Sequence, residues 1–147
     1  MTGKTVLILG GGIGGLVAAS ELRRLLTDEH RILLVERNPR HAFQPSFLWV
    51  MIGLRQPQQI TQDVRGLVHP GVDVILAEVQ AIDPTNRRVQ TSAQTLDYDY
   101  LIIALGAELN LGAIPGLAEG AHTYYTFDGA AKLHDALRNF AGGAVAL

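Results

Sequence analysis

The sequence contains no cysteine among its 147 residues. Disulfides, thiolate metal sites and a cysteine nucleophile are therefore excluded within this chain. Its five histidines show no ligand spacing, so we expect no metal site. We also find no pattern that identifies a catalytic acid, base or nucleophile in this segment.

Long apolar runs are also missing. Glycine or charge interrupts each candidate before it reaches the roughly 18 residues of a membrane span. A lysine precedes the first apolar run, as in a signal peptide, but glycines and a charged helix follow where a cleavage site would be expected. We therefore interpret the chain as soluble and cytoplasmic.

The chain has no excess of positive charge. Twelve Lys and Arg residues stand against fourteen Asp and Glu residues, for a net charge of -2. Without a basic run to neutralise phosphates, nucleic acid is not an expected partner. A hydrophobic content of 48% suffices for the core of one ordinary globular domain.

The hydrophobic pattern of the first 38 residues predicts a strand, a glycine turn, a helix and a second strand. Lys4–Leu9 and Arg31–Asn38 are short apolar runs, typical of strands buried on both faces of a parallel sheet. Between them, apolar residues recur at three- and four-residue steps over 13–26, with Glu21, Arg23 and Arg24 on the polar side. A helix that joins two neighbouring strands predicts a parallel pair.

The rest of the pattern predicts a loop with a helical turn over 47–52, a short helix over 61–67, and strands within 72–83, 87–91 and 95–107. Asn86 and Arg87 mark a hairpin, and a helix is expected over 128–140 with Asp128 as its cap. We expect an α/β fold: a Rossmann-like, doubly wound parallel sheet with a small antiparallel hairpin insertion. Residues 1–141 would form one domain at the N-terminal side of a longer protein, and residues 142–147 would begin a strand of the next domain.

The glycines after the first strand form a G-x-G-x-x-G motif at Gly10, Gly12 and Gly15. The first glycine permits a tight turn, the second a close approach by a pyrophosphate, and the third close packing of helix on strand. The helix N-terminus, with Ile13 and Gly14, then offers unpaired N–H groups to the phosphates.

Glu36 ends the second strand about 20 residues after the motif, where an acidic side chain accepts hydrogen bonds from ribose hydroxyls. Arg37 follows it and is placed in the same site. A carboxylate at this position disfavours the 2′-phosphate of NADP, so the pattern predicts NAD or FAD. The alternative is a solvated glutamate that pairs with Arg37 or Arg40.

A second segment, "YDYLIIALGA", is a strand that runs into a turn. Together with the glycine motif and Glu36, it resembles the FAD domain of the two-dinucleotide-fold flavoprotein oxidoreductases. The resemblance implies that Ala104, Leu105 and Gly106 stand where that family has A-T-G beside FAD. Leu105 departs from the usual threonine, although the glycine turn is kept. The resemblance also implies that the backbone of Val79 meets the adenine.

A third segment, "FQPSFLWVMIG", is similar to the F-x-P-S-x-x-W-V-x-x-G sequence of sulfide:quinone oxidoreductases and their flavocytochrome relatives. It implies that Gln44, Pro45 and Ser46 contact the cofactor. Phe43 and Trp49 either line the flavin or a quinone channel or plug the core. The family also implies a quinone acceptor, and peripheral membrane attachment through C-terminal segments.

The sequence departs from this family in the cysteines that handle the electron donor. Sulfide:quinone oxidoreductases usually have a cysteine near the position of Tyr125, and their other redox cysteines would lie beyond Leu147. No residue of this chain therefore supports sulfide oxidation by itself. Two alternatives stay open: a type II NADH dehydrogenase, which needs no such cysteines, and a non-catalytic dinucleotide-binding module.

Overall fold

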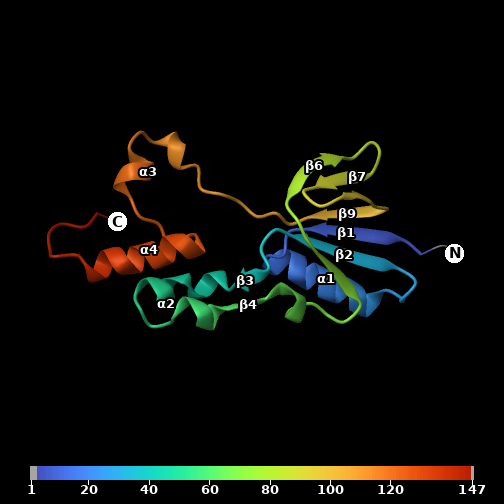
Figure 1. The fold of residues 1–147 in the computed structure, drawn as a ribbon, viewed down its shortest axis with the longest axis horizontal. Helices are drawn as coiled ribbons and strands as arrows, with labels where there is room; N and C mark the ends of the chain where they lie inside the picture. Colours follow the sequence, from blue (N-terminus) through green and yellow to red (C-terminus); the bar gives the residue numbers. More distant parts are fainter. Residues whose placement is uncertain (1–2, 147) are drawn as a thin grey trace. The chain divides into compact units, whose positions relative to one another are not determined.

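The structure is a computed structural model that describes residues 3–146. The chain divides into two compact units (Figure 1). The first runs to His41 and resumes over Gln62–Ala107; the second comprises Ala42–Thr61 and the residues from Glu108 onward. The glycine motif, Glu36 and Ala104–Gly106 belong to the first unit.

Four parallel strands form the main sheet of the first unit, within the described residues. They are β1 (Thr5–Leu9), β2 (Arg31–Glu36), β5 (Val72–Leu76) and β9 (Tyr100–Ile103), in the order β5-β2-β1-β9. Val6 of β1 lies between Ile32 of β2 and Tyr100 of β9. The chain order reverses between β1 and β9, and ligands of such sheets bind outside the carboxyl ends of the strands at this point.

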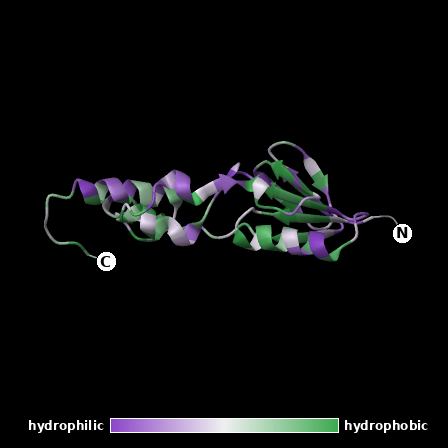
Figure 2. Ribbon diagram, turned by 90° about the horizontal axis from the view of Figure 1, so that it is seen from below, coloured by the Kyte–Doolittle hydropathy of each residue, from purple (hydrophilic) through white to green (hydrophobic). Residues whose placement is uncertain are grey.

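Both faces of this sheet are covered. Helix α1 (Ile13–Leu25) packs on one face, where Val6, Ile8, Ala19 and Leu34 are buried. On the other face lies an antiparallel sheet of β6 (Val79–Asp83), β7 (Arg88–Thr91) and β8 (Thr95–Asp97). Because both faces are covered, the central strands β1 and β2 are buried along most of their length. The sheet is accordingly hydrophobic (Figure 2).

The predicted α/β class and Rossmann-like sheet are confirmed, with differences in detail. The predicted strand over 72–83 is two strands, β5 and β6, and the one over 95–107 is β8 and β9. The hairpin at Asn86 and Arg87 joins β6 to β7, with Arg87 at φ 53°, and β8 extends it to three strands.

The predicted helix over 61–67 is wrong. Thr61–Asp63 forms strand β4, which pairs with β3 (Arg40–Ala42), and a 3-10 turn follows over Val64–Gly66. The Asp63 carboxylate accepts a hydrogen bond from Arg65 N at 2.8 Å and caps that turn. Pairing with a distant strand, which local periodicity does not reveal, decides this segment.

The second unit is built on two helices. A 3-10 turn over Gln44–Ser46 leads into α2 (Phe47–Met51), which packs on α4 (Phe127–Arg138) around buried Phe47, Val50 and Ala130. The Phe47 and Phe127 rings lie 6.0 Å apart. Shorter elements are the 3-10 turns Pro57–Ile60 and Leu111–Ala113 and helix α3 (Leu117–Gly120).

Two expectations for the C-terminal part are corrected. Thr126, not Asp128, is the N-cap of α4, since its Oγ1 accepts from Gly129 N at 3.1 Å, and Asp128 lies in the first turn. Residues 142–146 form no strand, and Leu147 lies outside the described residues. Gly142 and Gly143 have φ of 111° and 137°, which a strand does not accommodate.

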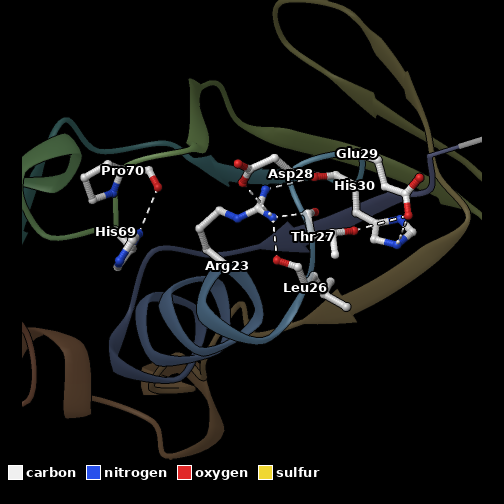
Figure 3. A network of polar contacts seen from close by, with 8 residues as sticks. All are labelled: Arg23, Leu26, Thr27, Asp28, Glu29, His30, His69 and Pro70. Atoms are coloured by element: carbon white, nitrogen blue, oxygen red, sulfur yellow. Dashed lines mark hydrogen bonds and ion pairs between the residues drawn. The ribbon is translucent and has the colours of Figure 1, made fainter.

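Arg23 is buried, contrary to the expectation that it lies on the polar face of α1. Its side chain is 5% exposed, and its guanidinium points at the end of its own helix (Figure 3). It donates to the carbonyls of Leu26, Thr27 and His30 at 2.8, 2.6 and 2.9 Å. The long arginine side chain thus connects α1 to its own C-cap and to the loop that follows it.

Within residues 3–146, no helix combines the length and the apolar character that crossing a bilayer requires.

Candidate functional site

Gly10 makes the turn out of β1. Its N–H donates to Val35 O at 2.8 Å, and its φ of 98° lies in the left-handed region. A Cβ on Gly10 would lie 2.3 Å from the carbonyl oxygen of Ala104. Both its conformation and its close neighbour therefore require glycine at this position.

The other two motif glycines differ from each other. Gly15 is buried, and a Cβ there would lie 1.8 Å from Gly10 O, so the third glycine brings α1 tightly against the turn. Gly12 is exposed, and a Cβ there would meet no atom of the described residues within 4 Å. The second glycine therefore leaves open space that a ligand can fill.

The first turn of α1 has its N–H groups available. Gly12 is the N-cap and has no side chain to cap them, and the sequence of the first turn contains no acidic residue. The helical ladder begins with Leu16 N donating to Gly12 O at 3.0 Å. The positive end of the helix dipole and these donors favour an anion such as a diphosphate.

Glu36 stands beside this turn. Its Oε2 accepts from Gly11 N at 2.5 Å and its Oε1 from Asn38 N at 2.8 Å. An ionised carboxylate has about four acceptor positions, so these two bonds leave capacity for ribose hydroxyls. A Cβ on Gly11 would lie 3.0 Å from the Glu36 side chain, so a glycine also suits this position between the first two glycines of the motif.

Ala104, Leu105 and Gly106 follow β9, next to the end of β1. Ala104 N donates to Leu9 O at 2.8 Å, and a Cβ on Gly14 would lie 3.9 Å from Ala104 Cβ. Gly106 has φ 78° and open space within 4 Å among the described residues. The structure thus brings the two predicted glycine turns together at the carboxyl ends of adjacent strands.

The remaining predicted positions are more dispersed. Val79 opens the edge strand β6 opposite Thr91, and Arg37 is exposed after β2. Gln44, Pro45 and Ser46 form the 3-10 turn of the second unit, where Ser46 is buried. Tyr125 precedes the N-cap of α4 and donates from its N–H to Thr123 Oγ1 at 3.0 Å. A shared site for these residues stays a prediction.

The aromatics of the second unit differ in their burial. Phe47 is in the core, whereas Phe43 and Trp49 are 47% and 45% exposed. The Arg55 guanidinium lies 5.8 Å from the Trp49 ring centre, a cation–π distance. Phe43 and Trp49 therefore do not plug the core of this unit.

Sequence reasoning missed two neighbours of the site. His41, on β3, has its Nδ1 3.1 Å from Gly11 O. Asn38 N supplies the second hydrogen bond to Glu36. The proximity of Asn38 to Glu36 in sequence gave a local signal, whereas nothing in the sequence connects His41 to a glycine 30 residues earlier.

The amino ends of the same strands are held by charged groups. The Asp99 carboxylate accepts from Thr5 N at 2.9 Å and from Lys4 Nζ at 2.9 Å. The Thr5 N–H first, and then the Lys4 ammonium, lower the pKa of Asp99 below its ordinary value. Asp99 thus binds the first backbone N–H of β1 and the side chain of the preceding lysine.

The strand order, the crossover helix and the glycine turn define a Rossmann-like fold, and the glycine turn lies at its topological switch point. Residues 4–145 match the family model "Pyridine nucleotide-disulphide oxidoreductase", and the chain belongs to that family. The family and its sulfide:quinone oxidoreductases are FAD-binding flavoproteins, which confirms the prediction of FAD.

Three relatives illustrate the similarity. The mitochondrial sulfide:quinone oxidoreductase of Dictyostelium discoideum is 29% identical over 97% of this chain and 33% of its own length. An NADH dehydrogenase-like protein of Mycobacterium tuberculosis is 34% identical over 94% of this chain and 35% of its own. The crystal structure of the Aquifex aeolicus sulfide:quinone oxidoreductase matches with a TM-score of 0.83 and 28% identity, over 92% of this chain and 32% of that one. The chain spans about a third of the length of these relatives.

Proposed function

We propose that this chain binds the adenylate half of FAD within a flavin-dependent quinone reductase of the sulfide:quinone oxidoreductase type. The observation that carries the proposal is the open turn at Gly12, with Glu36 beside it and Ala104–Gly106 at the next strand end. Buried glycines fix the shape of this turn, and its exposed glycine leaves the space that a diphosphate would need. Residues 1–141 would form the FAD-binding part, and residues 142–147 the beginning of a further domain.

Each residue of the turn has a distinct role in this proposal. The Gly12 N–H and the first N–H groups of α1, from Ile13 to Gly15, donate to the diphosphate. Glu36 accepts from the ribose hydroxyls with the lone pairs that Gly11 and Asn38 leave available.

The remaining contacts are proposed from the family resemblance. Ala104, Leu105 and Gly106 bring backbone close to the cofactor, and the backbone of Val79 meets the adenine. Arg37 lies near the ribose, and Gln44, Pro45 and Ser46 lie beside the flavin. When bound, FAD supplies two-electron chemistry between a reductant and an acceptor.

The donor and acceptor are proposed from the relatives. The names of the Dictyostelium and Aquifex proteins specify sulfide and quinone, and these matches favour a sulfide:quinone reductase. The Mycobacterium relative, named for NADH dehydrogenase, supports a type II NADH:quinone reductase as the second candidate. This chain has no cysteine. The second candidate needs none, whereas the first would need cysteines from outside this chain. Either reductase would work at the cytoplasmic membrane surface, attached peripherally.

FAD titration tests the binding site. The chain is expected to quench FAD fluorescence, and Glu36→Ala is expected to weaken the affinity about tenfold through the lost ribose contacts. Glu21→Ala removes an exposed glutamate from the far side of α1 and serves as the matched control. Equal affinity for the parent chain and Glu36→Ala would overturn the placement of the ribose.

A second assay separates the two donors. The protein expressed from its natural reading frame is supplied with a water-soluble quinone and either sulfide or NADH. Quinone reduction with sulfide alone supports the first candidate, and reduction with NADH alone supports the second. FAD binding without reduction by either donor would favour a non-catalytic dinucleotide-binding module.

A further inference from the structure

The peptide between Gly11 and Gly12 is contacted by a side chain from outside the glycine motif. The Gly11 carbonyl oxygen lies 3.1 Å from His41 Nδ1, and this contact is partly buried. A carbonyl oxygen can only accept a hydrogen bond, so a hydrogen bond at this contact requires the ring to carry a hydrogen at Nδ1. His41 reaches this position from β3, outside the glycine motif.

Two side chains hold the two peptides on either side of Gly11. Glu36 accepts from the N–H of Gly11, which belongs to the peptide between Gly10 and Gly11. His41 donates to the carbonyl of Gly11, which belongs to the peptide between Gly11 and Gly12. The two contacts are therefore not redundant, because each fixes the orientation of a different peptide plane.

The orientation of the second peptide determines where the Gly12 N–H points. In a planar trans peptide, the C=O and N–H bonds point in opposite directions. Because the Gly11 carbonyl is directed at His41, the Gly12 N–H is directed away from it. The space at Gly12, where a Cβ would meet no described atom within 4 Å, is open for a ligand to approach.

This peptide is otherwise easy to turn over. It lies between two glycines, which lack the Cβ that restricts backbone rotation in other residues. Rotation by half a turn would present the Gly11 carbonyl, instead of the Gly12 N–H, to an approaching ligand. An oxygen in that position would repel an anionic diphosphate.

We propose that His41 is a positioning residue of the dinucleotide site: its Nδ1–H holds the Gly11–Gly12 peptide so that the Gly12 N–H faces the diphosphate. This inference rests on the proposed function, since it takes FAD as the ligand. His41 itself need not touch the cofactor. Its role is to fix the direction of a backbone donor.

The consequence is tested by FAD titration of three His41 variants. His41→Ala removes the donor and is expected to weaken FAD binding about tenfold. In His41→Asn the side-chain amide nitrogen takes the place of Nδ1, and affinity is expected within about threefold of the parent. In His41→Gln the amide nitrogen takes the place of Nε2 instead, so no rescue is expected.

The matched control is His69→Ala. His69 is exposed, and its Nδ1 lies 2.8 Å from a different backbone carbonyl, that of Pro70 (Figure 3). Its removal is expected to leave FAD affinity unchanged. Equal binding by the parent and His41→Ala, or equal losses in His41→Asn and His41→Gln, would overturn the proposal.

The contact itself is tested without FAD. Nitrogen NMR of the histidine rings is expected to show His41 protonated at Nδ1 at neutral pH, and an Nε2–H tautomer would overturn the proposal. The two measurements separate the possible failures. A parent chain that binds no FAD contradicts the proposed function and with it the role of His41, whereas normal FAD binding with an Nε2–H tautomer contradicts the His41 role alone.

Discussion

The two ends of the β1–α1 unit differ in whether their backbone hydrogen-bonding groups already have partners within the chain. At the carboxyl end of β1, the N-cap of α1 is Gly12, which has no side chain to accept from the first N–H groups of the helix. A Cβ on Gly12 would meet no described atom within 4 Å, so this end is open. At the other end, buried Arg23 donates to carbonyls of the C-cap and of the loop after the same helix, and the Asp99 carboxylate accepts hydrogen bonds from Thr5 and Lys4. The open end leaves hydrogen-bonding capacity for a ligand, whereas the closed end uses it for stability. Substitutions at the two ends should therefore separate binding from stability.

The largest loss of stability is expected at Gly15, the glycine of the open end that is buried against the turn. Gly15→Ala would place a Cβ 1.8 Å from Gly10 O, against backbone that cannot move aside without shifting the whole turn. We expect a loss of about 4 kcal/mol or more in unfolding free energy, or no folded protein. Urea denaturation followed by circular dichroism measures it.

Gly14→Ala is the matched control, one residue earlier in the same helix. Its Cβ would lie 3.9 Å from Ala104 Cβ, an ordinary contact, and its stability is expected within about 1 kcal/mol of the parent. If Gly14→Ala and Gly15→Ala cost the same, the tight packing of α1 on the turn is not what requires glycine.

The closed end gives the next largest effect. Arg23→Ala removes a buried side chain and its three hydrogen bonds to carbonyls, and we expect about 3 kcal/mol lower stability because each of these bonds involves a charged donor. FAD affinity, measured below the new melting temperature, should change by less than about twofold. Arg24→Ala, which removes an exposed arginine from the same turn, should cost under about 0.5 kcal/mol. A large loss of FAD affinity in Arg23→Ala would mean that the two ends are coupled.

The opposite pattern is expected at Gly12. Gly12→Val would fill open space, so stability should change by less than about 1 kcal/mol while FAD affinity falls about a hundredfold. Gly120→Val is the control, since a Cβ on Gly120 also meets no described atom within 4 Å, far along the chain in α3. Unchanged FAD binding by Gly12→Val would contradict the assignment of Gly12 to the diphosphate.

The contrast between the ends also shows what the sequence could predict. The turn at Gly10 and the close packing at Gly15 follow from spacing within one strand–turn–helix unit, whereas the contact of Gly10 with Ala104 does not. The role of Gly12 at a diphosphate stays a prediction. The polar side of α1 was misjudged at Arg23 because periodicity assigns a face to the Cα, whereas a long side chain can fold back over its own helix end.

Long-range pairing accounts for the other differences. Residues 61–63 form a strand because β3 lies beside them, and neither of these two short strands has a strong sequence pattern of its own. His41 reaches Gly11 through that same excursion of the chain. In both cases the deciding partner is more than 15 residues away, beyond any local pattern.

The smallest effect concerns pH at the closed end. The pKa of Asp99 is lowered, so its contribution to stability is complete above the ordinary aspartate value of about 4 and is lost as pH falls through the lower value of the folded state. The difference in stability between the parent and Asp99→Asn should therefore be constant near neutral pH and shrink in acid. Thermal melts from neutral pH down to about pH 3 measure this difference, with FAD affinity at neutral pH expected to be equal in the two proteins. A difference that does not shrink would show that the Asp99 charge has no part in closing the amino end, and that the hydrogen bonds to Thr5 and Lys4 work equally well with a neutral acceptor.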